Sequence, residues 1–350
     1  MKPGTIFLVS ILILLYFNSA RSQDTSDMKR KLEPLRNNFA LAIHGGAGNI
    51  IHRNLTPEQQ QQYKDKMSEA LRAGYAILDT GGKSIDAVEA SIRIMEDSPL
   101  FNAGKGSVFT YEGKNEMDAA IMDGKTLKAG AVAGVRTIKN PISAAKKVMQ
   151  KSKFVLISGK GAEQFAKEQG LEIVDTSYFF TEERWKQLIQ VRDSAKTDSL
   201  KNDSTGSIIN KREDHYGTVG CVALDRHGNL AAGTSTGGIV NKKYNRIGDS
   251  PLIGAGTYAN NKTCAVSCTG HGEDFIRIVA AKTISDLMEY KGMSVSQAAA
   301  EVIKNKLSEI KGDGGTIVID KNGIITMPFN TTGMFRGYID RKGKVTVKIF

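Results

Sequence analysis

The segment GTVGCVALDRHGNLAAGTSTGG spans residues 217–238 and has the pattern of an antiparallel β-hairpin. Residues 219–224 form an unbroken apolar run, as expected of a buried strand, and residues 230–235 form the returning strand. The turn between them, residues 226–229, contains Gly228, which adopts backbone conformations that other residues avoid. Threonine stands beside glycine at the open end of this hairpin, in residues 217–218 and again in residues 234–238.

The same pairing of threonine with glycine occurs a third time. Residues 264–269 are predicted as a strand, and Thr269 is followed by Gly270-His271-Gly272, where a helix opens. A single such motif has an ordinary structural explanation, because threonine favours strands and glycine favours turns. Three strands that each present a hydroxyl beside glycines, between residues 217 and 272, indicate a site where a ligand approaches the backbone.

The rest of the chain alternates helices with hairpins. Residues 44–48 are predicted as a glycine-rich turn, and Thr56 and Ser84 as N-caps. We expect further strands at 39–43, 154–158, 316–320, 324–327, 334–338 and 345–350, and helices at 57–78, 84–96, 141–150, 161–168, 273–289 and 294–308. This order predicts helices layered over antiparallel sheets rather than a parallel, doubly wound sheet.

Residues 193–214 differ in composition from their surroundings. They are rich in Lys, Asp, Ser, Thr and Asn and contain few large apolar residues, so we predict a flexible linker, with an ordinary long surface loop as the alternative.

The chain is basic, with a formal net charge of +11, but its charges are scattered singly. Without a basic block or an aromatic-basic motif, we expect no nucleic-acid partner.

The first 20 residues have the pattern of a secretory signal peptide: Lys2, an apolar run over residues 6–17, and small residues at 19 and 20. A membrane anchor is the alternative, but the run is shorter than the about 20 apolar residues that span a bilayer. We therefore expect export to a periplasm or to the medium, and no membrane partner after removal of the signal.

Cysteine and histidine point to neither a disulfide scaffold nor a zinc site. Cys221, Cys264 and Cys268 are too few and are predicted to be small core residues, and the five histidines are scattered. A Gly-x-Ser-x-Gly nucleophile motif is absent from the sequence.

The chain resembles the plant-type asparaginases, which are also isoaspartyl (β-aspartyl) peptidases and belong to the N-terminal-nucleophile hydrolases. The resemblance covers residues 41–338, and the segments that carry it are 43–48, 101–107, 117–124, 217–225, 234–238, 246–256 and 267–270.

This resemblance implies a four-layer α-β-β-α sandwich with two mainly antiparallel sheets. It implies self-cleavage between Gly217 and Thr218, which gives an α subunit of residues 21–217 and a β subunit of residues 218–350 within one folded domain. A dimer of such αβ units is expected. Thr218 would then supply both the nucleophilic hydroxyl and a free α-amino base, whose reference pKa of about 7.7–8.0 suits neutral pH.

The other roles follow position by position from the same resemblance. Thr236 would orient the nucleophile, and Thr269 and Gly270 would form the oxyanion hole. Arg246 would hold the α-carboxylate of the substrate. The remaining expected substrate contacts are Asp249, which would accept the α-ammonium, Gly272 and Asn102.

No cofactor is expected for catalysis. The resemblance implies a structural sodium ion held by main-chain carbonyls of Met95, Glu96, Ser98, Phe101, Ala103 and Lys105, although Lys105 stands where the family often has an aliphatic residue.

The implied substrates are L-asparagine and β-aspartyl dipeptides. One alternative is a glycosylasparaginase, but that subgroup typically has asparagine at the position of Gly237 and lacks the segment 44–48. A catalytically silent binding protein with the same fold is the other alternative.

Overall fold

The predicted hairpin forms the centre of the molecule. In the computed structural model, which describes residues 38–50, 55–201 and 217–350, strands β5 (Val219–Leu224) and β6 (Leu230–Thr236) pair antiparallel, with Val219 opposite Ser235. Both strands are buried along their whole length because sheets and helices cover both faces. This prediction is confirmed.

The hairpin lies within an eight-stranded sheet. Its order is β12-β11-β1-β5-β6-β2-β3-β4, and every neighbouring pair is antiparallel except β3 and β4. The additional strands are β1 (Ala40–Gly48), β2 (Met117–Asp123), β3 (Ala129–Val135), β4 (Leu156–Ser158), β11 (Gly333–Ile339) and β12 (Val345–Lys348). Strands from before and after Thr218 are therefore interleaved, since β1 lies between β11 and β5.

A smaller sheet packs against the large one. It has the order β10-β9-β8-β7, with β7 (Thr257–Ala259), β8 (Cys264–Gly270), β9 (Gly314–Asp320) and β10 (Ile325–Thr326). Buried small and branched side chains fill the layer between the sheets, among them Ala42, Val222 and Val266. The three cysteines are free and buried, as predicted.

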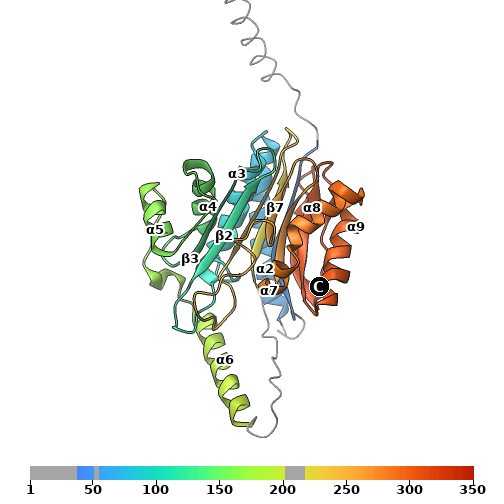
Figure 1. Cartoon of the computed structure of the whole chain (residues 1–350). Coiled ribbons are helices and arrows are strands. Elements are labelled where there is room, and N and C mark those ends of the chain that lie inside the picture. Colours follow the sequence, from blue (N-terminus) through green and yellow to red (C-terminus); the bar gives the residue numbers. More distant parts are fainter. Residues whose placement is uncertain (1–37, 51–54, 202–216) are drawn as a thin grey trace, which may run out of the picture. The chain divides into compact units, whose positions relative to one another are not determined.

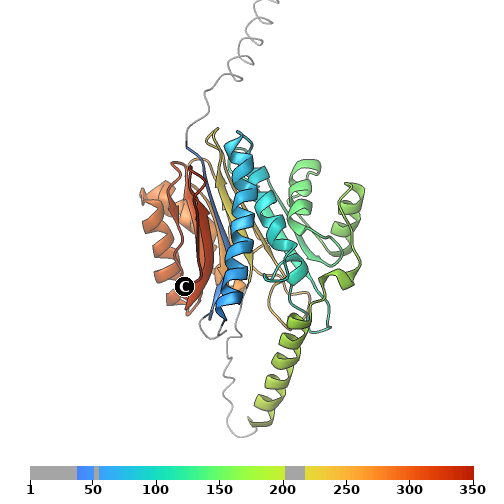
Figure 2. The ribbon, with the colours of Figure 1, turned by 180° about the vertical axis from the view of Figure 1, so that it is seen from behind.

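Helices cover the outer face of each sheet (Figures 1 and 2). The large sheet carries α2 (Pro57–Asp79), α3 (Ser84–Glu96), α4 (Pro141–Lys151) and α5 (Gly159–Glu168). The small sheet carries α7 (Gly272–Arg277), α8 (Ala280–Lys291) and the helical run of α9 (Val295–Ala300), η4 (Glu301–Lys306) and α10 (Leu307–Glu309). The four-layer α-β-β-α architecture is confirmed.

The two predicted N-caps have different outcomes. Thr56 forms a capping box with Gln59 at the start of α2, as predicted. Ser84 is not a cap, because it is already the first helical residue of α3. Its backbone N–H donates to Asp225 Oδ2 at 3.0 Å, so a carboxylate from the β5–β6 turn satisfies this helix end.

Residues 44–48 do not form the predicted turn. They continue β1, with a bulge between His44 and Gly46. Glycine is required there by close packing: a Cβ on Gly45 would lie 2.5 Å from the Phe101 ring, and one on Gly46 would lie 2.5 Å from the Gly217 nitrogen.

The predicted helix at 273–289 is broken into α7 and α8. Val279, between them, has φ 48°, a left-handed conformation that interrupts the helix. Ala281 and Lys282 donate their N–H groups to the carbonyls of Ala255 and Gly254. A tertiary contact thus supplies the partners that the preceding turn would have provided.

The predicted linker at 193–214 begins inside a helix. Helix α6 spans Glu182–Lys201, and the remaining linker residues, 202–214, lie outside the described residues, as does the signal peptide. Leu188 of α6, flanked by Trp185 and Val191, packs on Val108, Phe109 and Val240. Within the described part of the chain, no helix is both long and apolar enough to cross a bilayer.

Two short 3₁₀ helices complete the fold, η2 (Gly104–Gly106) and η3 (Thr176–Phe179).

Candidate functional site

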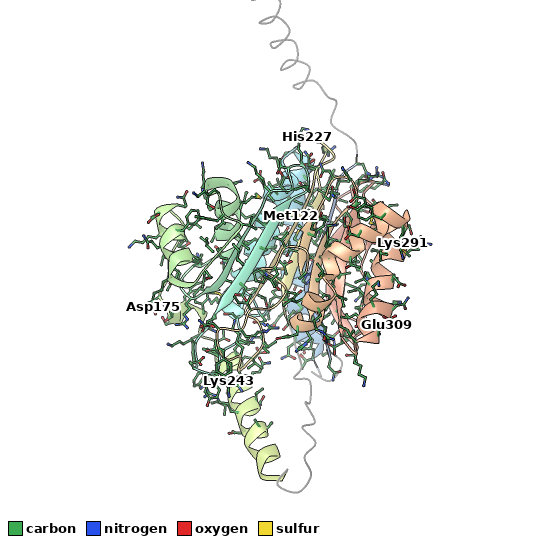
Figure 3. The ribbon with its side chains drawn as sticks, in the orientation of Figure 1. Met122, Asp175, His227, Lys243, Lys291 and Glu309 are labelled. Carbon is green, nitrogen blue, oxygen red and sulfur yellow. The ribbon has the colours of Figure 1, made fainter. Side chains whose placement is uncertain are left out.

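A pocket opens at the ends of β5, β6 and β8. It lies at the end of the hairpin opposite the turn that carries His227 (Figure 3). The structure brings together there all of the residues predicted for catalysis, cleavage and substrate binding. The lining residues are Asn102, Gly217, Thr218, Thr236, Gly238, Ile239, Arg246, Gly248, Asp249, Ser250, Thr269, Gly270 and Gly272.

The hydroxyl of Thr218 is held by a second threonine. Thr218 Oγ1 lies 3.1 Å from Thr236 Oγ1, and Thr236 Oγ1 also accepts the N–H of Gly238 at 3.0 Å. Because that N–H occupies an acceptor site of Thr236, the hydroxyl proton of Thr236 remains available to donate to Thr218.

The backbone before Thr218 is tightly constrained. Gly217 has φ 120°, and a Cβ there would lie 2.6 Å from both the Cβ and the nitrogen of Asn102. The Asn102 N–H donates to the Gly217 carbonyl oxygen at 2.9 Å. Only glycine fits this approach, and the carbonyl of residue 217 is already bound by a hydrogen-bond donor.

The side chain of Asn102 forms hydrogen bonds within the pocket wall. Its Nδ2 donates to the Gly238 carbonyl at 2.7 Å, and its Oδ1 accepts the Val108 N–H at 2.9 Å. Both ends of the amide therefore already have protein partners. A direct contact of Asn102 with substrate stays a prediction.

Thr269 and Gly270, at the end of β8 in the small sheet, line the same pocket as Thr218. Thr269 Oγ1 accepts the Ala47 N–H at 3.2 Å, which leaves its hydroxyl proton available for another acceptor. Gly270 has φ 154°, and a Cβ there would lie 2.4 Å from the Asp313 carbonyl oxygen. The arrangement suits a pair of donors aimed at an oxyanion.

Arg246 is held by a residue that the sequence analysis missed. Its Nε and Nη2 donate to the two carboxylate oxygens of Glu273 at 2.8 and 2.6 Å. A Cβ on Gly248 or on Gly272 would lie 2.8 or 2.7 Å from the guanidinium, so these glycines make room for it. Glu273 is the second residue of α7, directly after Gly272, and a charged residue beside a glycine motif is too common to have signalled this role.

Asp249 is a buried carboxylate with spare hydrogen-bonding capacity. It is 5% exposed, and its Oδ2 has no hydrogen-bond partner among the described residues. Burial raises the pKa of Asp249 to about 7, even though the positive charge of Arg246 favours the ionised form. A cationic ligand group would both satisfy the oxygen and stabilise the charge.

His44 also contacts the site, although the sequence analysis counted it among scattered histidines. Its Nδ1 lies 3.0 Å from the carbonyl oxygen of Thr218. Burial lowers the pKa of His44 to about 3, so the ring is neutral at physiological pH. The signal that could have revealed it is its place in β1, which pairs with β5 up to Gly220.

The six residues predicted to hold sodium lie in one closed loop. Met95 and Glu96 end α3, and the loop runs through Ser98, Phe101 and Ala103 to Lys105 in η2. A Cβ on Gly104 would lie 2.2 Å from the Glu96 carbonyl oxygen, and one on Gly106 would lie 2.1 Å from that of Phe101. Gly104 and Gly106 therefore lie close against two of the six main-chain carbonyls. Among the described residues, no group of His, Cys, Asp and Glu side chains could hold a metal.

Comparison with known proteins gives consistent results. The sequence model of the family described as "Asparaginase" matches residues 37–349. The chain is 47% identical over 298 residues to the isoaspartyl peptidase of Escherichia coli, covering 85% of this chain and 92% of that protein. It is 46% identical over 302 residues to the isoaspartyl peptidase of Salmonella typhimurium, covering 86% and 95%.

An animal relative extends the same similarity. The isoaspartyl peptidase/L-asparaginase of Rattus norvegicus is 42% identical over 288 residues, covering 81% of each chain. Since the family match and the relatives both cover most of the chain, the chain belongs to the asparaginase family.

Proposed function

We propose that this protein cleaves itself between Gly217 and Thr218 and then hydrolyses isoaspartyl dipeptides and L-asparagine, releasing L-aspartate. The names of its relatives support the substrate class. The observation that carries the proposal is the 3.1 Å contact between the hydroxyls of Thr218 and Thr236, in a pocket that also contains Arg246 and Asp249.

Self-cleavage requires an attack on the preceding carbonyl. Thr218 Oγ1 would add to the carbonyl carbon of Gly217, and the oxygen that becomes negative is the one bound by the Asn102 N–H at 2.9 Å. Transfer of the acyl group from nitrogen to oxygen gives an ester and a free amine on Thr218. Water then hydrolyses the ester, which leaves a carboxylate on Gly217.

The free amine makes turnover possible. The amine takes the proton from Thr218 Oγ1, and this oxygen attacks the side-chain carbonyl carbon of the substrate. Thr236 donates a hydrogen bond to Thr218 Oγ1. The hydroxyl of Thr269 and the N–H of Gly270 would stabilise the tetrahedral oxyanion. The amine returns the proton to the leaving group, and water hydrolyses the aspartyl ester. Before cleavage the nitrogen is an amide, so the uncleaved chain is expected to be inactive.

Two charges would select an α-amino acid. The edge of the Arg246 guanidinium that Glu273 does not contact can bind the substrate carboxylate. Asp249 Oδ2 can accept a hydrogen bond from the substrate ammonium. Gly272 lies against the guanidinium and lets the substrate approach the backbone.

The two alternatives are not favoured. A Cβ on Gly237 would lie 2.4 Å from Asn102 Oδ1, so the asparagine typical of glycosylasparaginases does not fit this wall. A catalytically silent protein has no need for the threonine pair at Thr218 and Thr236.

Intact-mass analysis of the wild type beside Thr218→Ala tests the proposal. By chain length, cleavage after Gly217 gives fragments of about 21 and 14 kDa, whereas Thr218→Ala should stay whole and release no ammonia from asparagine. Thr263→Val, which alters a buried threonine outside the pocket, is the matched control and should cleave like the wild type. Hydrolysis by intact Thr218→Ala would overturn the proposal.

We also propose that main-chain carbonyls of the 95–105 loop hold a structural sodium ion. Such hard oxygen donors suit this cation. The midpoint of thermal unfolding should rise with sodium chloride more than with choline chloride at equal ionic strength, and equal responses would contradict a specific site.

Export and dimerisation are further proposals. N-terminal sequencing of the protein recovered from a secreting host should begin after residue 20. The mass of the native protein in solution should equal two αβ units, and a single αβ unit at working concentrations would contradict the dimer.

A further inference from the structure

A chain of buried polar groups links the nucleophile to the substrate-binding loop. From the Thr218 carbonyl it runs through His44 to Ser267 Oγ, 2.9 Å from His44 Nε2. Ser267 Oγ lies 2.7 Å from Thr234 Oγ1, which lies 2.6 Å from Thr257 Oγ1. Thr257 Oγ1 lies 3.1 Å from the carbonyl of Ser250, which lines the pocket beside Asp249.

This hydrogen-bond chain crosses between the two sheets repeatedly. His44 and Thr234 belong to the large sheet, and Ser267 and Thr257 to the small one. A Cβ on Gly220 would lie 2.0 Å from Ser267 Oγ and 2.1 Å from His44 Nε2, so glycine is required for this crossing. A cluster of buried apolar side chains fills the layer between the sheets, and polar groups placed there cost free energy unless every one has a partner.

The shortest contacts give the hydrogens of this hydrogen-bond chain one direction. A carbonyl only accepts, so His44 Nδ1 must donate to Thr218, and the neutral ring then accepts at Nε2. Ser267 therefore donates to His44. The single proton of Thr234 has two acceptors in reach, Ser267 Oγ at 2.7 Å and the Gly256 carbonyl at 3.3 Å, and the shorter contact assigns it to Ser267. The proton of Thr257 is directed at Thr234, with the Ser250 carbonyl as its second acceptor. All the donors point toward Thr218, the arrangement in which hydrogen bonds reinforce one another.

The position of the Thr218 carbonyl explains why this matters. The β1–β5 ladder ends at the pair of His44 and Gly220, and the β5–β6 ladder ends at Val219 and Ser235. After cleavage, Thr218 would be a chain end beyond both ladders, held by the strand on one side only. His44 fixes the peptide plane of this residue, while Thr236 fixes its hydroxyl.

We propose that Ser267, Thr234 and Thr257 are positioning residues that lock His44 as the Nδ1–H tautomer and thereby fix the backbone of the nucleophile relative to the substrate loop. This inference rests on the proposed role of Thr218. None of the three hydroxyls lines the pocket, so they act through His44 and Ser250 rather than on the substrate.

The kinetic test compares variants that keep or remove a hydroxyl. Ser267→Ala and Thr234→Val should lower kcat of the mature enzyme about tenfold or more, since small misplacements of reacting groups are costly, with KM within about twofold of the wild type. Thr234→Ser keeps the hydroxyl and should retain most of kcat. Thr263→Val removes another buried hydroxyl pair, between Thr263 and Ser285, and should leave kcat unchanged.

The possible outcomes separate this inference from the proposed function. Equal losses of kcat in Thr234→Val, Thr234→Ser and Thr263→Val would show that these side chains act through packing and not through their hydrogen bonds. That result would overturn the inference. Retained activity in Thr218→Ala would instead overturn the role of Thr218 itself.

A measurement on the wild type reads the tautomer of His44 directly. Nitrogen-15 NMR of labelled imidazoles distinguishes the two neutral tautomers and the imidazolium. The His44 signal is assigned by replacing each of the other four histidines with glutamine. The Nδ1–H tautomer at pH 7.5 is expected, and the Nε2–H tautomer or an imidazolium would overturn the inference.

Discussion

The two walls of the pocket differ in how far the protein satisfies their polar groups. On the nucleophile wall, made of Thr218 and Thr236, the two hydroxyls contact each other, and the buried His44, which does not line the pocket, contacts the Thr218 carbonyl. On the charge wall, made of Arg246 and Asp249, one carboxylate oxygen has no partner among the described residues. Under the proposed function, the groups that react are therefore assembled in advance, whereas the groups that recognise charge would be completed by the substrate.

The backbone explains the difference. The nucleophile wall stands on strand ends, where ladders set each position. The charge wall stands on the loop after β6, in which Asn241, Tyr244 and Asn245 have positive φ values of 61°, 58° and 52°. Strain of this kind persists only where surrounding contacts hold it. Lys243, labelled in Figure 3, contributes such a contact, with its ammonium 4.2 Å from the centre of the Tyr111 ring.

The largest effect is expected from a substitution in the nucleophile wall. Thr236→Val keeps the shape of the side chain but removes the hydroxyl that lies 3.1 Å from Thr218 Oγ1. We expect kcat to fall about a hundredfold, with little change in KM, because the loss affects the reacting oxygen and not substrate charge. Steady-state kinetics on a cleaved preparation measures this, and Thr236→Ser is the control that restores the hydroxyl. A change confined to KM would contradict the division between the walls.

A smaller effect is expected on the charge wall. Lysine at position 246 cannot bind Glu273 and a substrate carboxylate through two parallel pairs of hydrogen bonds. Arg246→Lys should raise KM about thirtyfold and leave kcat nearly unchanged, since a charge-assisted bidentate contact is worth about 2 kcal/mol. An asparagine analogue with an amidated α-carboxylate is the control. If the variant lost as much activity on that analogue as on asparagine, Arg246 would not be the carboxylate contact.

The pH dependence tests Asp249. Its pKa is raised to about 7 in the substrate-free protein, and only the ionised carboxylate binds an ammonium well. As pH falls below 7 the group takes up a proton, so kcat/KM should fall about tenfold per pH unit, while kcat changes less because a bound ammonium lowers the pKa. Asp249→Asn should remove this step from the profile. An unchanged profile in that variant would assign the step to another group, such as the α-amino group of Thr218.

The smallest expected effect concerns Glu273. Burial opposes its ionisation, but the hydrogen bonds and charge of Arg246 hold the pKa of Glu273 well below its usual value. Because the pair is partly exposed to solvent, Glu273→Gln should raise KM only about threefold, with kcat unchanged. Recovery in Glu273→Asp would support an orienting role, and a lower KM in Glu273→Gln would show that Glu273 instead competes with the substrate carboxylate.

The sequence was sufficient to predict those candidate site residues that lie at the ends of strands. The run from Val219 to Leu224 and the Thr-Gly motifs predicted a hairpin and a cluster of hydroxyls, because both depend on local pattern. The layered architecture followed from the order of elements. The resemblance then assigned roles that pattern alone could not provide.

Sequence failed where a distant partner decides the outcome. The break at Val279 depends on carbonyls of Gly254 and Ala255, and the start of α3 depends on Asp225. Helix α6 extends into a polar segment because Leu188 and Trp185 anchor its first half against Val240. His44 and Glu273 were missed as site residues for the same reason, since their partners come from other strands or loops.

The interleaving of the large sheet has a consequence for how activity depends on protein concentration. An enzyme built from two polypeptides that associate reversibly loses activity on dilution, because the association obeys mass action. If Thr218 becomes a chain start, its fragment holds β5 and β11 on either side of β1, and β6 pairs with β2. Separating the fragments would open several ladders at once, which amounts to unfolding. The specific activity of each αβ unit should therefore be unchanged by dilution. Activation by cleavage would then be permanent, although the fold of the molecule stays the same.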